Sequence, residues 1–175
     1  MDPHPDDYLP TLSALLETVL PFDDPAFPGV PPARIRDRFL RMFRLEAERR
    51  FLLLQQALLF FDDVELFPET IPAILAEERR VLRGQAGLDL LLAGSVRRDR
   101  KLFAGFRSTA GPGPLRFTDL SLGRRREYFH LWSGSGFSVK RRFARSSRDL
   151  AMIAAYSLPE VWAAIGYEGP LLERS

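Results

Sequence analysis

A helical pattern runs through residues 31–61, whose sequence is PPARIRDRFLRMFRLEAERRFLLLQQALLFF. Apolar side chains recur at helical spacing along one broad face, namely Ile35, Phe39, Met42, Phe43, Leu45 and Phe51. Arginines and glutamates fill the opposite face, and Pro31-Pro32 suits the first turn of a helix. From Phe51 to Phe61 the stretch is apolar nearly all round, which is typical of a helix that lies centrally in a bundle or beneath a partner. The pattern predicts one long helix over residues 33–61.

Shorter helical patterns flank this segment on both sides. They predict helices over residues 9–20, 71–83, 95–106, from 117–121 through 132, 138–156 and a last short one opened by Pro159, with a broken helical piece over 84–94. Thr11 and Thr70 are candidate N-caps of the first and third of the expected helices. Gly111-Pro112-Gly113-Pro114 is the strongest loop signal, and Ser133-Gly134-Ser135-Gly136 is interpreted as a turn between helices.

The chain shows no internal repeat and no convincing strand pattern. We therefore expect an all-α fold, a single-domain irregular helical bundle over residues 1–175, with a flexible N-terminus at 1–8 and a Gly/Pro loop at 107–116. Hydrophobic residues make up 46% and charged residues 27%, an ordinary globular balance. No stretch reaches the roughly 18 apolar residues of a membrane span, so we expect no transmembrane segment.

Composition excludes several kinds of chemistry. Cysteine is absent, which rules out disulfides, thiolate catalysis and Cys-ligated metal centres. Histidine occurs only at His4 and His130, so the commonest general base and metal ligand is scarce. Nothing in the chain assembles into a nucleophile, a base and an orienting group, and we expect no catalytic residue.

Charge is distributed unevenly along the chain. Residues 1–93 carry 10 basic and 16 acidic side chains, a net charge of −6, whereas residues 94–175 carry 15 basic and 7 acidic ones, a net charge of +8. The two halves therefore suit each other, or the second half suits an acidic partner. Basic clusters occur at 124–126 and at 140–148, and they leave open the alternative of a stand-alone helical nucleic-acid-binding protein.

Three further motifs have a functional and a structural interpretation. Glu127 and His130 form an E-x-x-H, but di-iron bundles need two such motifs and this chain has one, so we expect no metal. The Gly-rich 133–136 lacks a phosphate-binding pattern, and we expect no bound cofactor. Asp62-Asp63, like Asp23-Asp24, is more typical of helix caps and turns than of an acid–base pair.

Four segments carry a resemblance to a known family. They are LSALLETVLP at 12–21 followed by an acidic Pro-Gly loop, FTDL at 117–120 before 124–132, the late helix 143–156, and PEVW at 159–162 followed by IGYEGP at 165–170. Together they resemble the gluconate 2-dehydrogenase subunit 3 family, the small subunits of flavin-dependent dehydrogenases of the glucose-methanol-choline (GMC) oxidoreductase type. The similarity covers most of the chain, and its two ends are the most specific parts.

The resemblance implies an all-α accessory subunit without a flavin of its own. Such a subunit binds a large FAD-containing catalytic subunit, helps it to mature and often supplies its export signal. This chain begins Met1-Asp2-Pro3-His4 and lacks the twin-arginine leader typical of the family. The resemblance therefore favours a cytoplasmic complex, or a periplasmic one if a leader was removed. It implies no catalytic residues.

The apolar tail from Tyr156 to Pro170 agrees with such a role. It is rich in aromatic residues, and a terminus of this kind should dock on the chain's own core or on a partner. Aromatic residues and arginine are common anchors of interfaces. We expect the partner interface to include Trp132, Arg142, Trp162, Ile165 and Tyr167. The alternative is that both tryptophans belong to an ordinary core.

Overall fold

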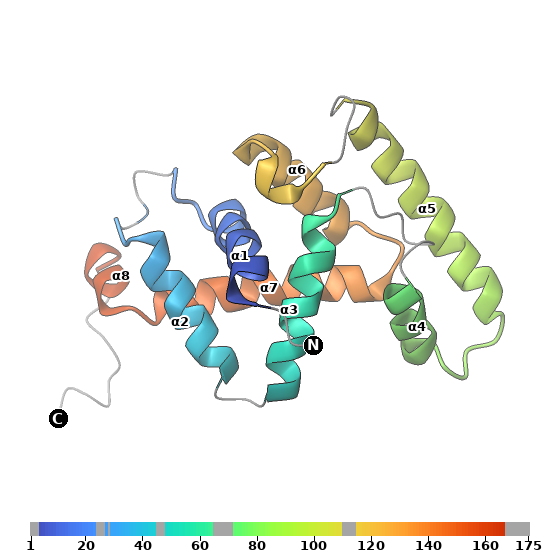
Figure 1. Ribbon diagram of the computed structural model, residues 1–175, viewed down its shortest axis with the longest axis horizontal. Helices are drawn as coiled ribbons and strands as arrows, with labels where there is room; N and C mark the ends of the chain where they lie inside the picture. Colours follow the sequence, from blue (N-terminus) through green and yellow to red (C-terminus); the bar gives the residue numbers. More distant parts are fainter. Residues whose placement is uncertain are drawn as a thin grey trace. The chain divides into compact units, whose positions relative to one another are not determined.

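The computed structural model describes residues 4–23, 27, 29–44, 48–64, 72–109 and 115–166. In these ranges the chain forms eight α-helices and one short 3₁₀ helix (Figure 1). They are α1 (Pro5–Val19), α2 (Pro32–Arg44), α3 (Glu48–Asp62), α4 (Pro72–Val81), α5 (Leu88–Ser108), η2 (Phe117–Asp119), α6 (Leu122–Ser133), α7 (Ser138–Tyr156) and α8 (Pro159–Ala164). The only β feature of the described ranges is an isolated bridge between Asp63 and Arg116. The expected all-α fold is confirmed.

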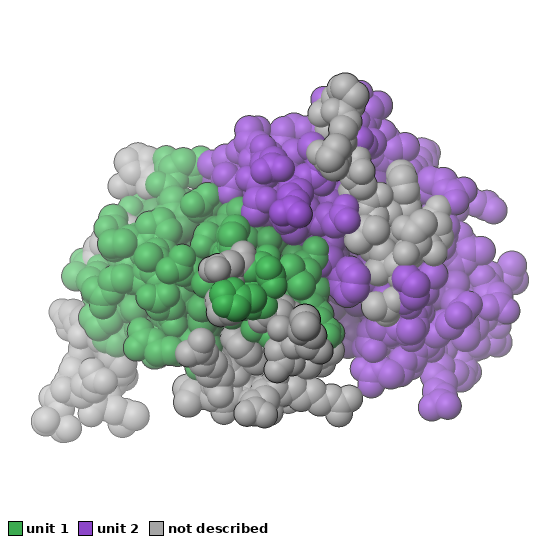
Figure 2. Space-filling view, in the orientation of Figure 1, with its two compact units in different colours: residues 1–59, 147–175 green, residues 60–146 purple. Residues whose placement is uncertain are grey.

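Two compact units make up the chain (Figure 2). Unit 1 comprises residues 1–59 and 147–175, and unit 2 comprises residues 60–146. The chain leaves unit 1 near the end of α3 and returns to it within α7. The expectation of one domain over residues 1–175 stays a prediction. None of the helices that the described residues form is long and apolar enough to cross a lipid bilayer.

Helices α1 and α2 contact each other and supply much of the core of unit 1. The buried apolar side chains of these two helices are Tyr8, Leu12, Ala14, Leu15, Leu16, Ile35 and Phe39. Their spacing of three and four residues places them on one face of each helix, as the sequence pattern predicts. Alanines 151, 154 and 155 of α7 are also buried, and their small side chains allow close packing.

Unit 2 is built around aromatic side chains. The ring of Phe61 lies 4.5 Å from that of Phe117, 4.8 Å from that of Trp132 and 5.2 Å from that of Tyr128, measured between centroids. Tilted and edge-on aromatic pairs of this kind contribute about 0.5–1.5 kcal/mol each beyond the area they bury. Burial raises the pKa of the Tyr128 phenol, because the charged form of the group is disfavoured inside the core.

The structure corrects several expected helix boundaries. Helix α1 begins at Pro5 and Tyr8 is buried, so the N-terminal segment expected to be flexible already contributes to the core, and Thr11 lies inside the helix rather than at its N-cap. Residues 33–61 form two helices, α2 and α3, instead of one. The two pieces expected within 84–106 form the single helix α5. Thr70, residues 45–47 and half of the expected Gly/Pro loop, 110–114, lie outside the described residues.

Candidate functional site

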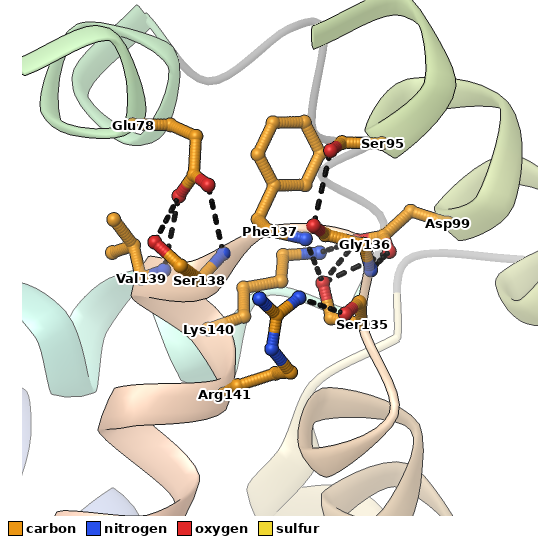
Figure 3. A network of polar contacts seen from close by, with 10 residues as sticks. All are labelled: Glu78, Ser95, Asp99, Ser135, Gly136, Phe137, Ser138, Val139, Lys140 and Arg141. Carbon is orange, nitrogen blue, oxygen red and sulfur yellow. Dashed lines mark hydrogen bonds and ion pairs between the residues drawn. The ribbon is translucent and has the colours of Figure 1, made fainter. Parts of the chain in front are cut away.

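The turn between α6 and α7 holds the most polar constellation of unit 2 (Figure 3). Helix α6 ends at Ser133, where the N–H of Gly134 donates to the carbonyl oxygens of the last helical turn. Helix α7 begins at Ser138, so the expected turn at 133–136 is confirmed. The polar side chains that fix this turn come from α4, α5 and the first turn of α7.

Asp99 of α5 is the centre of the constellation and is 0% exposed. Its carboxylate accepts hydrogen bonds from the Ser135 hydroxyl at 2.8 and 2.9 Å, from the Gly136 N–H at 2.6 Å and from the Lys140 ammonium at 2.9 Å. A buried carboxylate is tolerated only when its charge is compensated and its oxygens are hydrogen-bonded. The α6–α7 turn and Lys140 supply both conditions.

Lys140 faces Asp99 from the first turn of α7. The residue is 1% exposed, and its ammonium lies 4.3 Å from the ring centroid of Phe103 and 5.1 Å from that of Trp132. Cation–π contacts with aromatic faces strengthen when the cation is desolvated. Lys140 begins the basic cluster at 140–148, but it does not belong to a surface, because this cation neutralises a carboxylate inside the core.

A second buried carboxylate, Glu78 of α4, holds the N-terminus of α7. It accepts hydrogen bonds from the N–H of Ser138 at 2.9 Å, from the N–H of Val139 at 3.0 Å and from the Ser138 hydroxyl at 2.9 Å. The first N–H groups of a helix lack partners within the helix, and the positive end of the helix dipole favours an anion there. Glu78 therefore acts as an N-terminal cap contributed by a different helix.

Changing Glu78 to glutamine is expected to lower the free energy of unfolding by about 1–3 kcal/mol. The variant puts an amide donor where both carboxylate oxygens accept from Ser138 and Val139. The matched control is Glu77→Gln on the same helix, because Glu77 pairs with Arg80 at the surface, where that hydrogen bond lowers the pKa of Glu77. An exposed ion pair of this kind contributes little to stability, because solvent screens it. Urea unfolding compares the variants, and equal losses would contradict the capping role.

Backbone packing fixes the same turn against α5. The Ser95 hydroxyl donates to the Gly136 carbonyl oxygen at 3.0 Å. A Cβ atom on Gly136 would lie 2.7 Å from both the Cα and the carbonyl oxygen of Ser95, which is closer than real Cβ contacts. Only glycine allows the turn to approach the helix so closely.

The components of this constellation could in principle serve as nucleophile and base. The Ser135 hydroxyl donates its proton to Asp99 and accepts the N–H of Phe137 at 3.0 Å. Ser135 and Asp99 are both fully buried, so no substrate reaches them in this conformation. The arrangement supports a structural role that joins α4, α5 and the α6–α7 turn.

The E-x-x-H motif and Asp62, which the sequence offered as candidates for metal binding or acid–base chemistry, form structural contacts instead. Glu127 accepts a hydrogen bond from Arg124, and His130 is exposed one turn later. No three His, Asp or Glu side chains gather into a metal-binding group among the residues that the structure describes. Asp62 accepts the N–H of Thr118 at 3.0 Å, which is the capping role preferred for that residue.

Three arginines of the basic clusters donate hydrogen bonds to backbone carbonyl oxygens, and one of them is Arg125, which donates to that of Leu120 at 3.1 Å. Arg124 donates to the carbonyl oxygen of Phe106 at 2.8 Å and lies over its ring. Arg141 donates to the carbonyl oxygen of Ser135 at 2.6 Å. These side chains are therefore partly committed to the fold, which weakens the case for a continuous nucleic-acid surface along 124–126 and 140–148.

Unit 1 presents a surface of apolar side chains at the end of α7 and on α8. Ile153 is 55% exposed, and Tyr156, one helical turn later, is also exposed. The indole N–H of Trp162 donates to the carbonyl oxygen of Tyr156, which brings α8 against the end of α7. Ile165 follows Trp162 by three residues and is exposed. We call these four residues the α7–α8 surface.

The five expected interface residues occupy different environments. Trp162 and Ile165 lie together on the α7–α8 surface, and Tyr167 lies outside the described residues. Trp132 is 4% exposed and lies inside the aromatic core of unit 2, which agrees for this residue with the alternative that the tryptophans belong to an ordinary core. Its side chain therefore offers no surface to a partner. Arg142 is exposed on α7, and its charge helps to lower the pKa of Glu77.

The chain was also compared with known proteins. Models of protein families, curated proteins and solved structures gave no match to this sequence or fold.

Proposed function

We propose that this chain is a non-catalytic small subunit that binds, stabilises and helps to mature a large FAD-dependent dehydrogenase of the GMC type. The complex would act on a sugar, a glycoside or another alcohol, and the FAD would belong to the large subunit. The resemblance of segments 12–21, 117–132, 143–156 and 159–170 to small subunits of such enzymes supports this proposal. The resemblance is most specific at the two ends of the chain, and the C-terminal end contributes Trp162 and Ile165 to the α7–α8 surface.

The observation that carries the proposal is the exposure of apolar side chains on the α7–α8 surface. Ile153, Tyr156 and Ile165 are exposed although core positions are available in the same helices, as buried Ala154 and Val161 show. Contiguous exposed apolar side chains on a soluble domain are typical of protein interfaces. Burying an isoleucine yields about 1.5–3 kcal/mol, so covering this surface would stabilise a complex.

Co-expression with a neighbouring GMC-type flavoprotein tests the proposal. The tag is placed on this chain, and the visible spectrum of the eluate is recorded. We expect a yellow complex with flavin absorption that bleaches when a suitable alcohol or sugar is added. A colourless chain that recovers no large subunit would contradict the proposed function.

Changing both Ile153 and Ile165 to serine is expected to weaken the complex with the large subunit at least about tenfold. The two residues are 55% and 49% exposed, so the double variant should keep its fold while losing apolar area at the interface. Affinity is measured by titrating the tagged variant with the purified flavoprotein.

The matched control is Leu59→Ser, because Leu59 is an exposed apolar residue that belongs to α3 and not to the α7–α8 surface. It should leave the affinity for the flavoprotein unchanged. A complex that forms with equal affinity in the double variant, while its circular dichroism stays that of the original protein, would contradict the assignment of this surface.

A further inference from the structure

A strongly cationic surface on α4 and α5 has no role in the proposed function. Seven cations occur between residues 77 and 101, and all are exposed: Arg79, Arg80, Arg83, Arg97, Arg98, Arg100 and Lys101. The same stretch holds four carboxylates, but Glu78 and Asp99 are buried. Only Glu77 and Asp89 remain outside the core, and Glu77 pairs with Arg80.

The buried carboxylates explain why this surface is so positive. Asp99 is turned inward to the α6–α7 turn and Lys140, and Glu78 is turned inward to the N-terminus of α7. Both carboxylates are therefore unavailable to neutralise the arginines beside them in the sequence. A surface with an excess of one charge sign attracts partners of the opposite sign over about a Debye length.

Apolar side chains accompany these cations at the start of α5. Leu90 is 81% exposed and Leu91 is also exposed. Arg97 and Lys101 follow Leu90 by seven and eleven residues, spacings that return to the same face of a helix. Leu90, Arg97, Arg98 and Lys101 thus form one outward-facing strip, which we call the α5 basic face.

We propose that the α5 basic face is a docking surface for an acidic protein segment that carries apolar side chains among its carboxylates. The cations select a partner of negative charge, and Leu90 supplies apolar area that only a partially apolar partner would bury. A helix lying in a membrane interface has an apolar face along its length. In α5 that face, with Leu92, Phe103 and Phe106, is already buried in the protein. Nucleic acid would use the cations and leave Leu90 in water.

A site-specific fluorophore tests this proposal on the full chain. Because the sequence has no cysteine, Ala93→Cys gives a single label on an exposed position of α5. The probe is a synthetic helical peptide of about 20 residues with glutamate and leucine on one face, long enough to form a helix. We expect saturable binding that weakens when ionic strength rises from about 0.01 to about 1 M, because the Debye length then falls from about 30 to about 3 Å.

Two variants assign the binding to the α5 basic face. Reversing Arg97, Arg98 and Lys101 to glutamate should lower the affinity for the peptide at least about tenfold, and Leu90→Ser should lower it at high salt as well. The matched control reverses Arg116, Arg126 and Arg145, three exposed arginines of the same unit, with the same change of net charge. This control should bind the peptide within about twofold of the original chain.

Several outcomes would overturn the proposal. They are absence of binding to the peptide, equal binding to a peptide with serine in place of leucine, and equal losses in the two charge-reversal variants. Binding to a single-stranded oligonucleotide that is indifferent to Leu90→Ser would assign the face to nucleic acid instead. Binding only to phosphatidylserine vesicles would assign it to a membrane. None of these results depends on whether the chain has a flavoprotein partner.

Discussion

Replacing Asp99 with alanine is expected to lower the free energy of unfolding by about 3–5 kcal/mol. The change removes the carboxylate that lies 2.9 Å from the buried Lys140 ammonium. It also removes the acceptor of the Ser135 hydroxyl and of the Gly136 N–H, both of which are held inside unit 2. Breaking one side of a buried ion pair is costly because the remaining charge stays desolvated. Urea unfolding followed by circular dichroism measures the loss.

Asp89→Ala on the same helix is the matched control for Asp99→Ala. Asp89 is exposed in the first turn of α5, where its interaction with the helix dipole contributes about 1 kcal/mol or less. The double variant Asp99→Leu with Lys140→Met removes both charges, and it should recover most of the stability because buried ion pairs can be replaced by apolar side chains. This variant also keeps the test usable if Asp99→Ala does not fold. Equal losses for Asp99→Ala and Asp89→Ala would contradict the structural role of Asp99.

Gly136→Ala is expected to lower the free energy of unfolding by about 1–3 kcal/mol. The added methyl group would lie 2.7 Å from the Cα and the carbonyl oxygen of Ser95. Both are backbone atoms of α5, so the clash can be relieved only by moving the helix or the turn. Either movement would also disturb the hydrogen bonds between the turn and Asp99.

Gly94→Ala, one residue before Ser95, should change stability in the opposite direction. No atom lies within 4 Å of a Cβ at Gly94, and the residue is exposed in the interior of α5. Alanine there should raise the free energy of unfolding by about 0.5–1 kcal/mol. Thermal and urea unfolding compare the free energies of unfolding of the two variants. If Gly136→Ala is as stable as the original protein, the close approach of the turn to α5 is absent.

Helix content followed directly from the spacing of apolar residues. Glycines separate two strong helical patterns in the second half of the chain. The sequence therefore predicted the helix ending near 132, the helix 138–156 and the turn between them. The division of 33–61 into α2 and α3 was not predicted, because that stretch contains neither glycine nor proline. Residues 45–47, which lie between the two helices in the sequence, are outside the described residues.

The buried ion pair was missed for a different reason. Lys140 is followed by Arg141 and Arg142, and a run of cations normally lies at the surface. One signal was available in α5, where Asp99 lies four residues before Phe103 and seven before Phe106, on the apolar face of the helix. A carboxylate on such a face requires a buried cation or N–H donors. The sequence of α5 alone does not name Lys140 as that cation.

Glu78 and the α7–α8 surface show what a single sequence leaves undetermined. Glu78 is adjacent to Glu77 in a helix, and only the approach of the α7 N-terminus distinguishes the buried cap from the surface ion pair. Trp162 belongs to the short helix α8 and Ile165 follows directly after its end, and their place in a partner interface stays a prediction. Trp132 and Trp162 are the same type of residue but lie in different environments. The environment of Trp132 depends on contacts with Phe61 and Phe143, which are distant in the sequence or belong to another helix.

The placement of the two tryptophans has a spectroscopic consequence. The chain contains only Trp132 and Trp162, the first enclosed in the core of unit 2 and the second partly exposed in unit 1. Each unit therefore carries its own intrinsic fluorophore. Replacing one tryptophan at a time with phenylalanine yields a protein whose emission follows a single unit, so fluorescence can distinguish one cooperative melting transition from two.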